Sequence, residues 1–564
     1  MHNKGLSRRN FFKGAGVALA GAAGAAALSG CAPAASPKSA DSDAKGASAS
    51  AADWLGEAPQ FSDSDVKETY DTEVLVVGAG TSGIFAACSA VENGAKCICI
   101  EKVGEDAVSD GVRDTLGALN SSQQQADGAN PNRFDVINEM VRQANGYGDD
   151  RLYAVWADNS GEAIDWYTER LAENDTVFAH EVDDHPNHMR FPTYDVGHSV
   201  QWKGPEYSTS YTAGILMEYG KGLGLEVHHD TALQCLIKDE TGRVTGAYAK
   251  QGNDVVRYNA SKGVIMCTGG YASNMDMLEA LQPETVKLIG INSAFPGVTG
   301  DGIKACLWAG GVMDDCHAGV LFDRAAVEPD ATDATNGQLF WMGSQPFLKV
   351  NLDGERFTNE SGCYDHILHT SLNLKGSTYC TVWDANYAAD IERFDTHGCS
   401  RLFPHANGTA PVMPLVVIDS MNQDLMDKGY IVESDTIEGL AEKLNIPADA
   451  FTKTVARYNE LADAGDDPDF GKEAYRLSHM DTPPFRGVRQ HGGYFISTLD
   501  GVKIDTDMHV IDEHGEAIPG LYAAGDCSGS YFGNSYVNLL SGAAAGRSVT
   551  FGRLAGKNAA KDIA

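Results

Sequence analysis

Three glycines and one acid within residues 74–101 carry the clearest chemical signal of the chain. Gly78, Gly80 and Gly83 follow a short apolar run, a helical stretch comes next, and a second apolar run ends in Glu101. Glycines at this spacing permit a tight turn, the close approach of a pyrophosphate and the packing of a helix on a strand. The pyrophosphate then lies at a helix N-terminus, and the acid accepts a ribose hydroxyl. The pattern predicts a dinucleotide site, with a glycine turn that serves packing alone as the alternative.

Two later segments favour FAD over NAD. Residues 264–271 form an apolar strand that runs into a glycine turn, and residues 520–526 form a strand that ends in Gly-Asp. FAD is long, and an acid at a second strand end, such as Asp526, can bind its ribityl hydroxyls. A final helix over about 542–560 would direct its positive N-terminus at the flavin. We therefore predict non-covalent FAD and no metal, with these cofactor residues: Gly78, Gly80, Thr81, Ser82, Gly83, Glu101, Lys102, Gly269, Gly270, Asp301, Gly525 and Asp526.

The elements that must position these groups alternate between strand and helix, which is typical of an α/β fold. The chain has 564 residues, of which 43% are hydrophobic, so it can hold two domains or one large domain with an insertion. The net charge of −35 argues against nucleic acid or an anionic membrane as a partner and fits docking on a basic redox protein. The 12 cysteines form no CxxCH or CxxC motif, and most are expected to be small buried hydrophobes.

The N-terminal residues predict export. Arg8 and Arg9 precede a short apolar run from Gly14 to Ala27, which is typical of a twin-arginine signal. Leu-Ser-Gly before Cys31 resembles a lipoprotein processing site, with simple cleavage and an unmodified cysteine as the alternative. Residues 32–67 are rich in small and polar residues and are expected to form a flexible tether. We expect an outer-face location on the cytoplasmic membrane, held by a lipid anchor.

Further motifs give a specific family resemblance. Thr268-Gly269-Gly270, Thr299-Gly300-Asp301-Gly302, the run 354–360, residues 520–526 and the run 550–556 follow the glycine fingerprint in order. The chain resembles the FAD-dependent fumarate reductase/succinate dehydrogenase flavoproteins, in the soluble flavocytochrome branch that includes 3-ketosteroid dehydrogenases. This resemblance implies a Rossmann-like FAD domain split into residues 68–302 and 488–564 by an inserted α/β capping domain at 303–487. The cap includes a helical stretch from Thr436 to Ala464, with Thr436 as its N-cap.

The same resemblance indicates that the residues that bind a dicarboxylate in the family are missing from this sequence. Fumarate reductases of this branch hold a dicarboxylate with a histidine and two arginines. The corresponding segments here contain Ile496 to Gly501, Leu539 with Leu540, and Trp341 with Met342, and none of them holds the expected histidine or arginine. Burying two carboxylates against such side chains costs several kcal/mol per charge, on the order of the transfer cost of an unpaired ion. We predict that fumarate is not the substrate and that Trp341, Met342, Leu539 and Leu540 line a larger apolar pocket.

Ser535-Tyr536 resembles the Ser-Tyr pair that handles a proton beside the flavin in ketosteroid dehydrogenases. A tyrosine hydroxyl can act as an acid or polarise a carbonyl, so Tyr536 is the leading catalytic candidate, and Tyr494 and Tyr531 are the others. Packing roles are the alternative for all three, because the chain has 21 tyrosines. His180, His185, His188 and His198 show no ligand spacing and are expected on the surface or in loops.

The leading hypothesis is an exported FAD-dependent reductase of an activated C=C bond in an unsaturated organic molecule, used as a respiratory electron acceptor. Electrons would come from a membrane-associated cytochrome or a quinol system, because the chain has no haem motif and no covalent-FMN domain. A ketosteroid-like dehydrogenase that works in the desaturating direction is one alternative. A flavin-bearing electron carrier without turnover is another.

Overall fold

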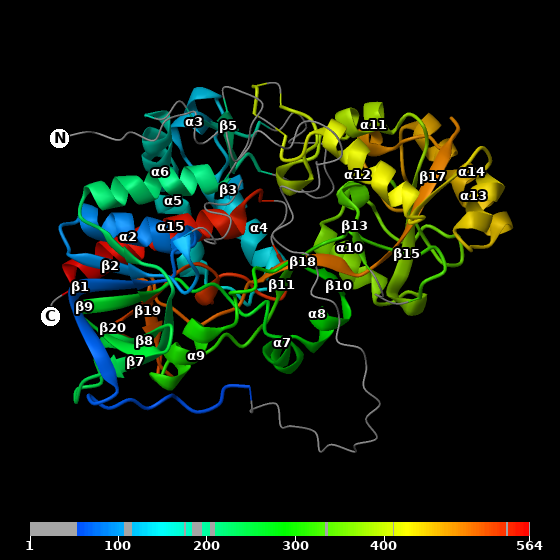
Figure 1. Ribbon diagram of the computed structural model, residues 1–564. Helices are drawn as coiled ribbons and strands as arrows, with labels where there is room; N and C mark the ends of the chain where they lie inside the picture. Colours follow the sequence, from blue (N-terminus) through cyan, green and yellow to red (C-terminus); the bar gives the residue numbers. More distant parts are fainter. Residues whose placement is uncertain are drawn as a thin grey trace, which may run out of the picture.

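The computed structural model describes residues 54–105, 115–173, 176–182, 194–202, 209–332, 337–405, 407–409, 411–536 and 540–562. The predicted signal with Cys31, most of the predicted tether, and Leu539 lie outside the described residues. Among the helices that are described, none is both long and apolar enough to span a membrane. The described part forms two lobes, seen side by side in Figure 1.

The larger lobe is built on a sheet of eight strands whose central members are parallel. Its main path runs β19-β20-β9-β1-β2-β6, and β7 and β8 extend it beside β9. β1 pairs in parallel with β2 and β9, and β9 pairs in parallel with β20, so their carboxyl ends meet at one edge. The strands are β1 (Val66–Val77), β2 (Cys97–Ile100), β6 (Glu226–His228), β7 (Thr231–Lys238), β8 (Val244–Gln251), β9 (Asp254–Met266), β19 (His509–Ile511) and β20 (Ala517–Ala523).

Two helices from opposite ends of the chain pack closely on this sheet. α2 (Thr81–Glu92) is the helix of the glycine fingerprint, and α15 (Ala543–Lys561) is the final helix. A Cβ on Gly552 would lie 2.4 Å from the Ser82 carbonyl oxygen, and one on Gly556 would lie 2.2 Å from that of Ala86. Only glycine permits such an approach, so both ends of the sequence build one lobe. This agrees with the predicted split FAD domain.

Further elements complete the larger lobe. A helical layer holds α3 (Ser122–Ala126), α4 (Arg133–Gln143), α5 (Asp150–Ala172) and α6 (Thr209–Gly222). A three-stranded sheet has β5 (Gly197–Trp202) between β3 (Thr115–Gly117) and β4 (Thr176–His180). A second three-stranded sheet has β18 (Gly493–Thr498) between β10 (Ile289–Asn292) and β11 (Gly319–Phe322), near α7 (Met275–Leu281), α8 (Pro283–Lys287) and α9 (Asp301–Trp308).

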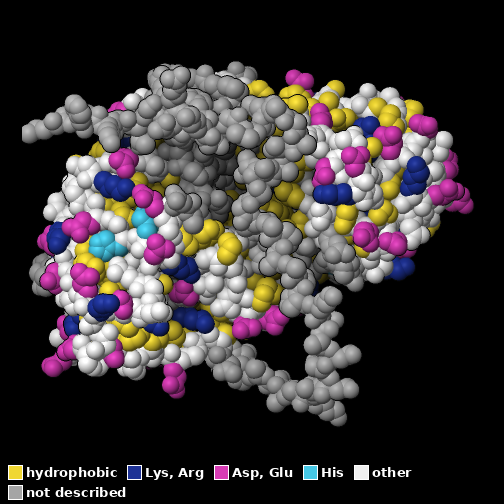
Figure 2. Space-filling model, in the orientation of Figure 1, with side chains coloured by type: hydrophobic (Ala, Val, Ile, Leu, Met, Phe, Trp, Pro, Cys, Tyr) yellow, Lys and Arg dark blue, Asp and Glu magenta, His cyan; other side chains and the backbone are white. Residues whose placement is uncertain are grey.

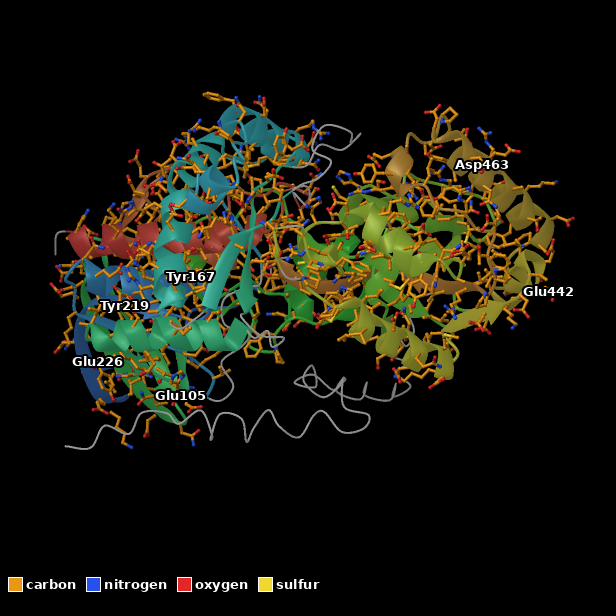
Figure 3. All side chains as sticks on the ribbon, turned by 90° about the horizontal axis from the view of Figure 1, so that it is seen from above. Glu105, Tyr167, Tyr219, Glu226, Glu442 and Asp463 are labelled. Carbon is orange, nitrogen blue, oxygen red and sulfur yellow. The ribbon has the colours of Figure 1, made fainter. Side chains whose placement is uncertain are left out.

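The smaller lobe is the predicted cap. Its sheet runs β13-β12-β17-β15-β14, with β16 also paired to β17. The strands are β12 (Ala325–Val327), β13 (Gln338–Leu339), β14 (Leu348–Asn351), β15 (Thr378–Trp383), β16 (Ile431–Ser434) and β17 (Phe485–His491). The helices are α10 (Tyr364–Ser371), α11 (Tyr387–Phe394), α12 (Leu415–Asp427), α13 (Ile437–Lys443) and α14 (Ala448–Ala464). Glu442 and Asp463 lie at the end of the cap far from Glu226 of the larger lobe (Figure 3).

The bounds of the cap elements bear on three local predictions. The Thr436 side chain accepts a hydrogen bond from the Gly439 N–H and caps α13, as predicted. The predicted helix to Ala464 is divided in two, because Pro447 lies directly before α14 and lacks the N–H that a continuous helix needs. The first cap strand begins at Ala325, and Ile303 packs in the core of the larger lobe, so the predicted start of the cap at 303 falls in the FAD domain.

The expectation for the histidines was wrong where the structure describes them. His180 and His198 are fully buried, whereas His185 and His188 lie outside the described residues. The His198 Nε2 lies 2.7 Å from Ser121 Oγ and Nδ1 lies 3.0 Å from the Val196 carbonyl oxygen. Burial, followed by the neighbouring His180, lowers the pKa of His198 to about 4. The polar sequence around them gave no sign of burial, because Ser121 and Asp127, which contact them from the two ends of α3, are distant in the sequence.

Candidate functional site

One elongated cavity crosses the larger lobe from the glycine fingerprint to the cap. Its walls include these candidate cofactor residues: Gly78, Gly80, Thr81, Ser82, Glu101, Lys102, Gly269, Asp301, Gly525 and Asp526. The end near the cap is lined by Thr115, Val320, Phe322, Cys399, Ile496, Tyr536, Gly542, Ala544 and Ala545. Ten of the twelve predicted cofactor residues thus surround one space, although they lie up to several hundred positions apart in the sequence.

The fingerprint glycines have distinct surroundings. Gly78 has φ +100°, and a Cβ there would lie 2.4 Å from the Cys267 carbonyl oxygen. A Cβ on Gly83 would lie 1.8 Å from the Gly78 carbonyl oxygen, so Gly83 permits the packing of α2 on the turn and does not line the cavity. Gly80 is different, because a Cβ there would meet no atom within 4 Å. It opens onto the cavity at the N-terminus of α2, where a pyrophosphate needs space and backbone N–H groups.

Glu101 and Lys102 stand at the same end of the cavity. The Glu101 carboxylate accepts the Ala79 N–H at 2.8 Å and the Val103 N–H at 3.1 Å. These bonds fix the acid beside the glycine turn. Lys102 Nζ lies 2.7 Å from the Asp301 carboxylate and 3.0 Å from Thr299 Oγ1. This pair joins β2 to the start of α9 across the cavity.

A second acid is fixed farther along the cavity. The Asp526 carboxylate lies 3.0 Å from Arg547 Nη2 and also accepts a hydrogen bond from Ser497 Oγ. Gly525, with φ +71°, turns the chain here. Gly270 does not line the cavity, because a Cβ there would lie 1.8 Å from Thr498 Oγ1 and the position serves packing.

The first residues of α15 line the cap end of the cavity. Gly542 has φ +73°, and a Cβ there would lie 2.5 Å from the Thr115 carbonyl oxygen. No side chain caps this helix, and Ala544 and Ala545 line the space with small side chains. A flat ring can therefore reach the free N–H groups and the positive end of the helix dipole. A glycine cradle, two fixed acids and a small-residue helix start along one elongated space fit FAD.

Comparison with known proteins decides the family. The family model described as "FAD binding domain" matches residues 73–541. The chain belongs to this family. The predictions of the FAD-dependent fumarate reductase flavoprotein superfamily, of FAD as the cofactor, of the α/β fold with a cap and of an FAD-dependent oxidoreductase are confirmed.

Three similar proteins illustrate the range of the relatives. Vinyl phenol reductase of Lactiplantibacillus plantarum is 28% identical, over 88% of this chain and 97% of that protein. The fumarate reductase (cytochrome) of Shewanella frigidimarina is 27% identical, over 87% and 78%. Digoxin reductase of Eggerthella lenta is 28% identical, over 99% and 97%.

Two solved structures share the fold. A 3-ketosteroid-Δ4-(5α)-dehydrogenase from Rhodococcus jostii RHA1 has a TM-score of 0.65 at 24% identity, over 89% of this chain and 99% of that one. The open conformation of a flavocytochrome c3 fumarate reductase has a TM-score of 0.58 at 23% identity, over 88% and 79%.

The three candidate tyrosines lie in different places in this flavoprotein. Tyr536 lines the cavity at its cap end, and its backbone N–H lies 3.3 Å from the Asp365 carboxylate. Tyr494 is on β18, two residues before Ile496, and its hydroxyl accepts a hydrogen bond from Ser293 Oγ at 2.7 Å. Tyr531 is fully buried and does not line the cavity. Its ring packs on Tyr153 and on the guanidinium of Arg547, which indicates a structural role.

The predicted substrate residues need correction where the structure describes them. Met342 is fully buried in the core of the cap, and Leu540 is fully buried in the core of the larger lobe. Trp341 packs beside Met342 in a short 3-10 turn, Trp341–Ser344, and like the other two does not line the cavity. The apolar character of these residues reflects core packing. The cavity wall near the cap is formed instead by Phe322, Cys399 and Ile496, together with Tyr536.

Arg324, which was not predicted from the sequence as a site residue, lies behind this wall. The Arg324 guanidinium is fully buried and lies 4.0 Å from the Trp341 ring centre and 4.6 Å from that of Phe322. Its Nε donates to Ser344 Oγ, and Nη2 donates to the Cys399 carbonyl oxygen, both at 2.8 Å. The available signal was the Asp323-Arg324 pair that follows the apolar strand, at the point where the chain enters the cap.

A second buried arginine lies on the other side of Cys399. Arg401 Nη1 is 2.6 Å from Glu181 Oε1, and both side chains are 2% exposed. Glu181 also accepts hydrogen bonds from Ser199 Oγ and from the Gly398 N–H. Burial alone would raise the pKa of Glu181, but Arg401, with His405 and His397, outweighs it and lowers the pKa to about 2. The loop after α11 is thus bound to the end of β4 next to the cavity.

Proposed function

We propose that this flavoprotein reduces an activated C=C bond in an unsaturated organic molecule that enters the cap end of the cavity. The observation that carries the proposal is the position of Tyr536 on the wall of the FAD cavity, which the start of α15 also lines. The names of relatives support the reaction type, since they include vinyl phenol, fumarate, urocanate and acrylate reductases.

FAD, when bound, supplies the hydride. In the proposal, Tyr536 holds the proton that the second carbon of the double bond receives. Asp365 fixes the backbone of Tyr536 through its N–H, and the start of α15 orients the ring. Phe322, Cys399 and Ile496 keep water from the reacting atoms.

We further propose that the substrate is larger and less charged than fumarate. A diacid needs two cationic or multiple N–H contacts. Arg401 is already paired with Glu181, and the Arg324 guanidinium donates to Ser344 and to Cys399. Neither guanidinium lines the cavity. Two aromatic side chains, Phe322 and Tyr536, line its cap end, and this favours an aromatic or alicyclic acceptor.

The cellular setting is part of the proposal. The N-terminal pattern supports export by the twin-arginine route and a lipid anchor on Cys31. Asp and Glu side chains spread over both lobes of the face in Figure 2. Such a surface favours a basic membrane-associated cytochrome as electron donor, and a quinol system is the alternative. The acceptor would then serve anaerobic respiration.

An anaerobic screen tests the reaction. The purified holoprotein is reduced with reduced viologen, and enones, cinnamates and fumarate are added in turn. We expect reoxidation by one unsaturated class and, in Tyr536→Phe, a rate about 10²- to 10⁴-fold lower, the usual contribution of a positioned acid. Tyr531→Phe is the matched control, because its ring is buried away from the cavity. Reoxidation by fumarate alone would contradict the substrate class, and reoxidation by none would favour an electron carrier. Reduction of the flavin by a saturated ketosteroid would favour the desaturating direction.

A further inference from the structure

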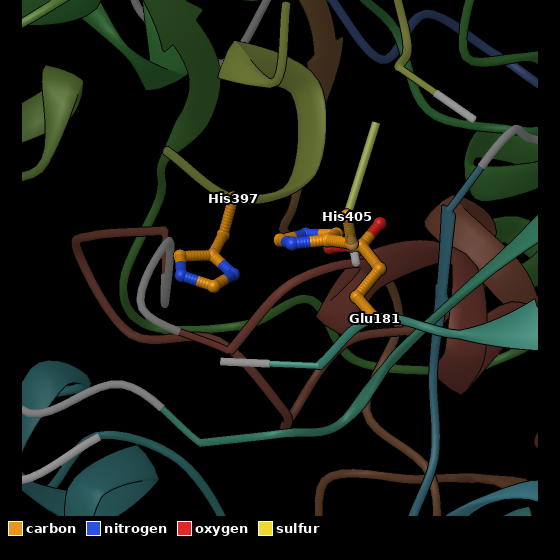
Figure 4. A group of neighbouring side chains, drawn as sticks. All are labelled: Glu181, His397 and His405. Carbon is orange, nitrogen blue, oxygen red and sulfur yellow. The ribbon is translucent and has the colours of Figure 1, made fainter. Parts of the chain in front are cut away.

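Glu181, His397 and His405 bring three metal-ligating side chains together where the cap meets the larger lobe (Figure 4). One possible ligand atom of each residue lies within 4.8 Å of the other two. The histidines come from the loop between α11 and α12, and the acid follows β4, so the group is assembled only by the tertiary fold. None of the three lines the FAD cavity, and the proposed reaction uses none of them.

The buried side chain of His405 also points to a bound ligand. Its side chain is 4% exposed, and its Nε2 has no hydrogen-bond partner. A buried polar atom without a partner destabilises a folded protein, and a bound ligand removes that penalty. An imidazole nitrogen is a common metal ligand.

The nearby Asp395 carboxylate lies at a distance from both histidines that suits a further ligand of the same ion. Asp395 Oδ1 lies 3.9 Å from His405 Nδ1, and Asp395 Oδ2 lies 4.0 Å from His397 Nε2. Both distances are longer than a hydrogen bond. Each is about twice the ~2.0–2.1 Å length of a bond between zinc and an imidazole nitrogen, so one ion fits between the two atoms.

The Glu181 carboxylate also has an oxygen on the side of the histidines. Arg401 Nη1 contacts Glu181 Oε1, which leaves Oε2 to face an ion besides the Gly398 N–H.

We propose that Glu181, His397 and His405, with Asp395 beside them, bind one divalent transition-metal ion. Imidazole and carboxylate ligands suit Zn²⁺ and Fe²⁺. The ion would fix the loop that carries Cys399, at the wall of the FAD cavity, to the larger lobe. It has a structural role, and no electron or proton passes through it.

The test is metal content, which is independent of turnover. The full-length holoprotein is purified, its metals are measured by mass spectrometry, and Zn²⁺ is titrated by calorimetry after treatment with a chelator. We expect about one equivalent of bound metal, as a closed site requires. His397→Ala/His405→Ala should lose it, and His514→Ala, whose side chain is 76% exposed, should keep it.

Folding is checked by the flavin absorbance spectrum and the melting temperature of each variant. Should the double variant fail to fold, His397→Gln alone should weaken Zn²⁺ binding at least tenfold. The inference is overturned when the wild-type protein binds no Zn²⁺. It is also overturned when the wild-type protein and the folded histidine variants bind the metal equally.

Discussion

Arg547 and Asp526 form an ion pair at the wall of the FAD cavity, with Nη2 and Oδ1 3.0 Å apart. The arginine is fully buried, and the aspartate side chain is 24% exposed. Arg547 Nη1 also donates to the Ser528 carbonyl oxygen, and the guanidinium packs on the rings of Tyr531 and Phe532. The final helix thus fixes both the acid that faces the cofactor and the segment that leads to Tyr536.

Arg547→Leu should lower both stability and FAD affinity. Removing one partner of a fully buried pair costs about 3–5 kcal/mol, and we expect about 2–4 kcal/mol here because water reaches Asp526. Urea unfolding and flavin release, followed by fluorescence, measure the two effects. Arg457→Leu is the control, because that arginine is 48% exposed and its loss should cost no more than about 1 kcal/mol. Equal losses of stability and FAD affinity in the two variants would show that the ion pair of Arg547 with Asp526 contributes no more than an exposed ion pair.

Two fingerprint glycines should respond differently to the same substitution. Gly83→Ala places a methyl group 1.8 Å from the Gly78 carbonyl oxygen, so α2 must shift and the free energy of unfolding of the apoprotein should fall. Gly80→Ala places its methyl group in open space, so the apoprotein should unfold like the wild type while FAD binding weakens by tenfold or more, about 1.4 kcal/mol. Chemical denaturation of apoprotein and titration with FAD separate the outcomes. Unimpaired FAD binding by the Gly80 variant would place the pyrophosphate elsewhere.

His198 should make stability depend on pH. Its pKa of about 4 in the folded protein is below the 6.5 of an ordinary histidine, so the unfolded chain binds the proton first as the pH falls. Its contribution is therefore complete above about pH 6.5 and is lost as the pH falls to about 4, by up to about 3 kcal/mol. His198→Gln should reduce this slope in unfolding experiments between pH 7 and 4. The exposed His514→Gln should not change it, and identical slopes for all three proteins would contradict the assignment.

The parts of the site that were predicted from sequence share a local cause. Gly78, Glu101 and Asp526 each lie shortly after a strand end, where a short pattern determines the backbone and the edge of the sheet brings the groups together. The contact of Gly398 with Glu181 joins residues 217 positions apart and rests on no repeated pattern. Arg401 and His405 were missed for the same reason. Trp341 and Met342 were misplaced because apolar side chains suit a protein core as well as a substrate pocket.

Met342 and Cys399 should respond in opposite ways to substitution. Met342→Ala should lower the free energy of unfolding by about 2–5 kcal/mol, because the side chain is fully buried and contacts Asn422, whereas the KM for the substrate found in the screen should stay unchanged. Cys399→Leu should do the reverse, since the larger side chain extends from the cavity wall into the cavity: KM should rise severalfold, with a smaller destabilisation than in Met342→Ala. Steady-state kinetics under anaerobic conditions and urea unfolding of both variants give the four values. A raised KM in a stable Met342→Ala variant would restore Met342 to the substrate site.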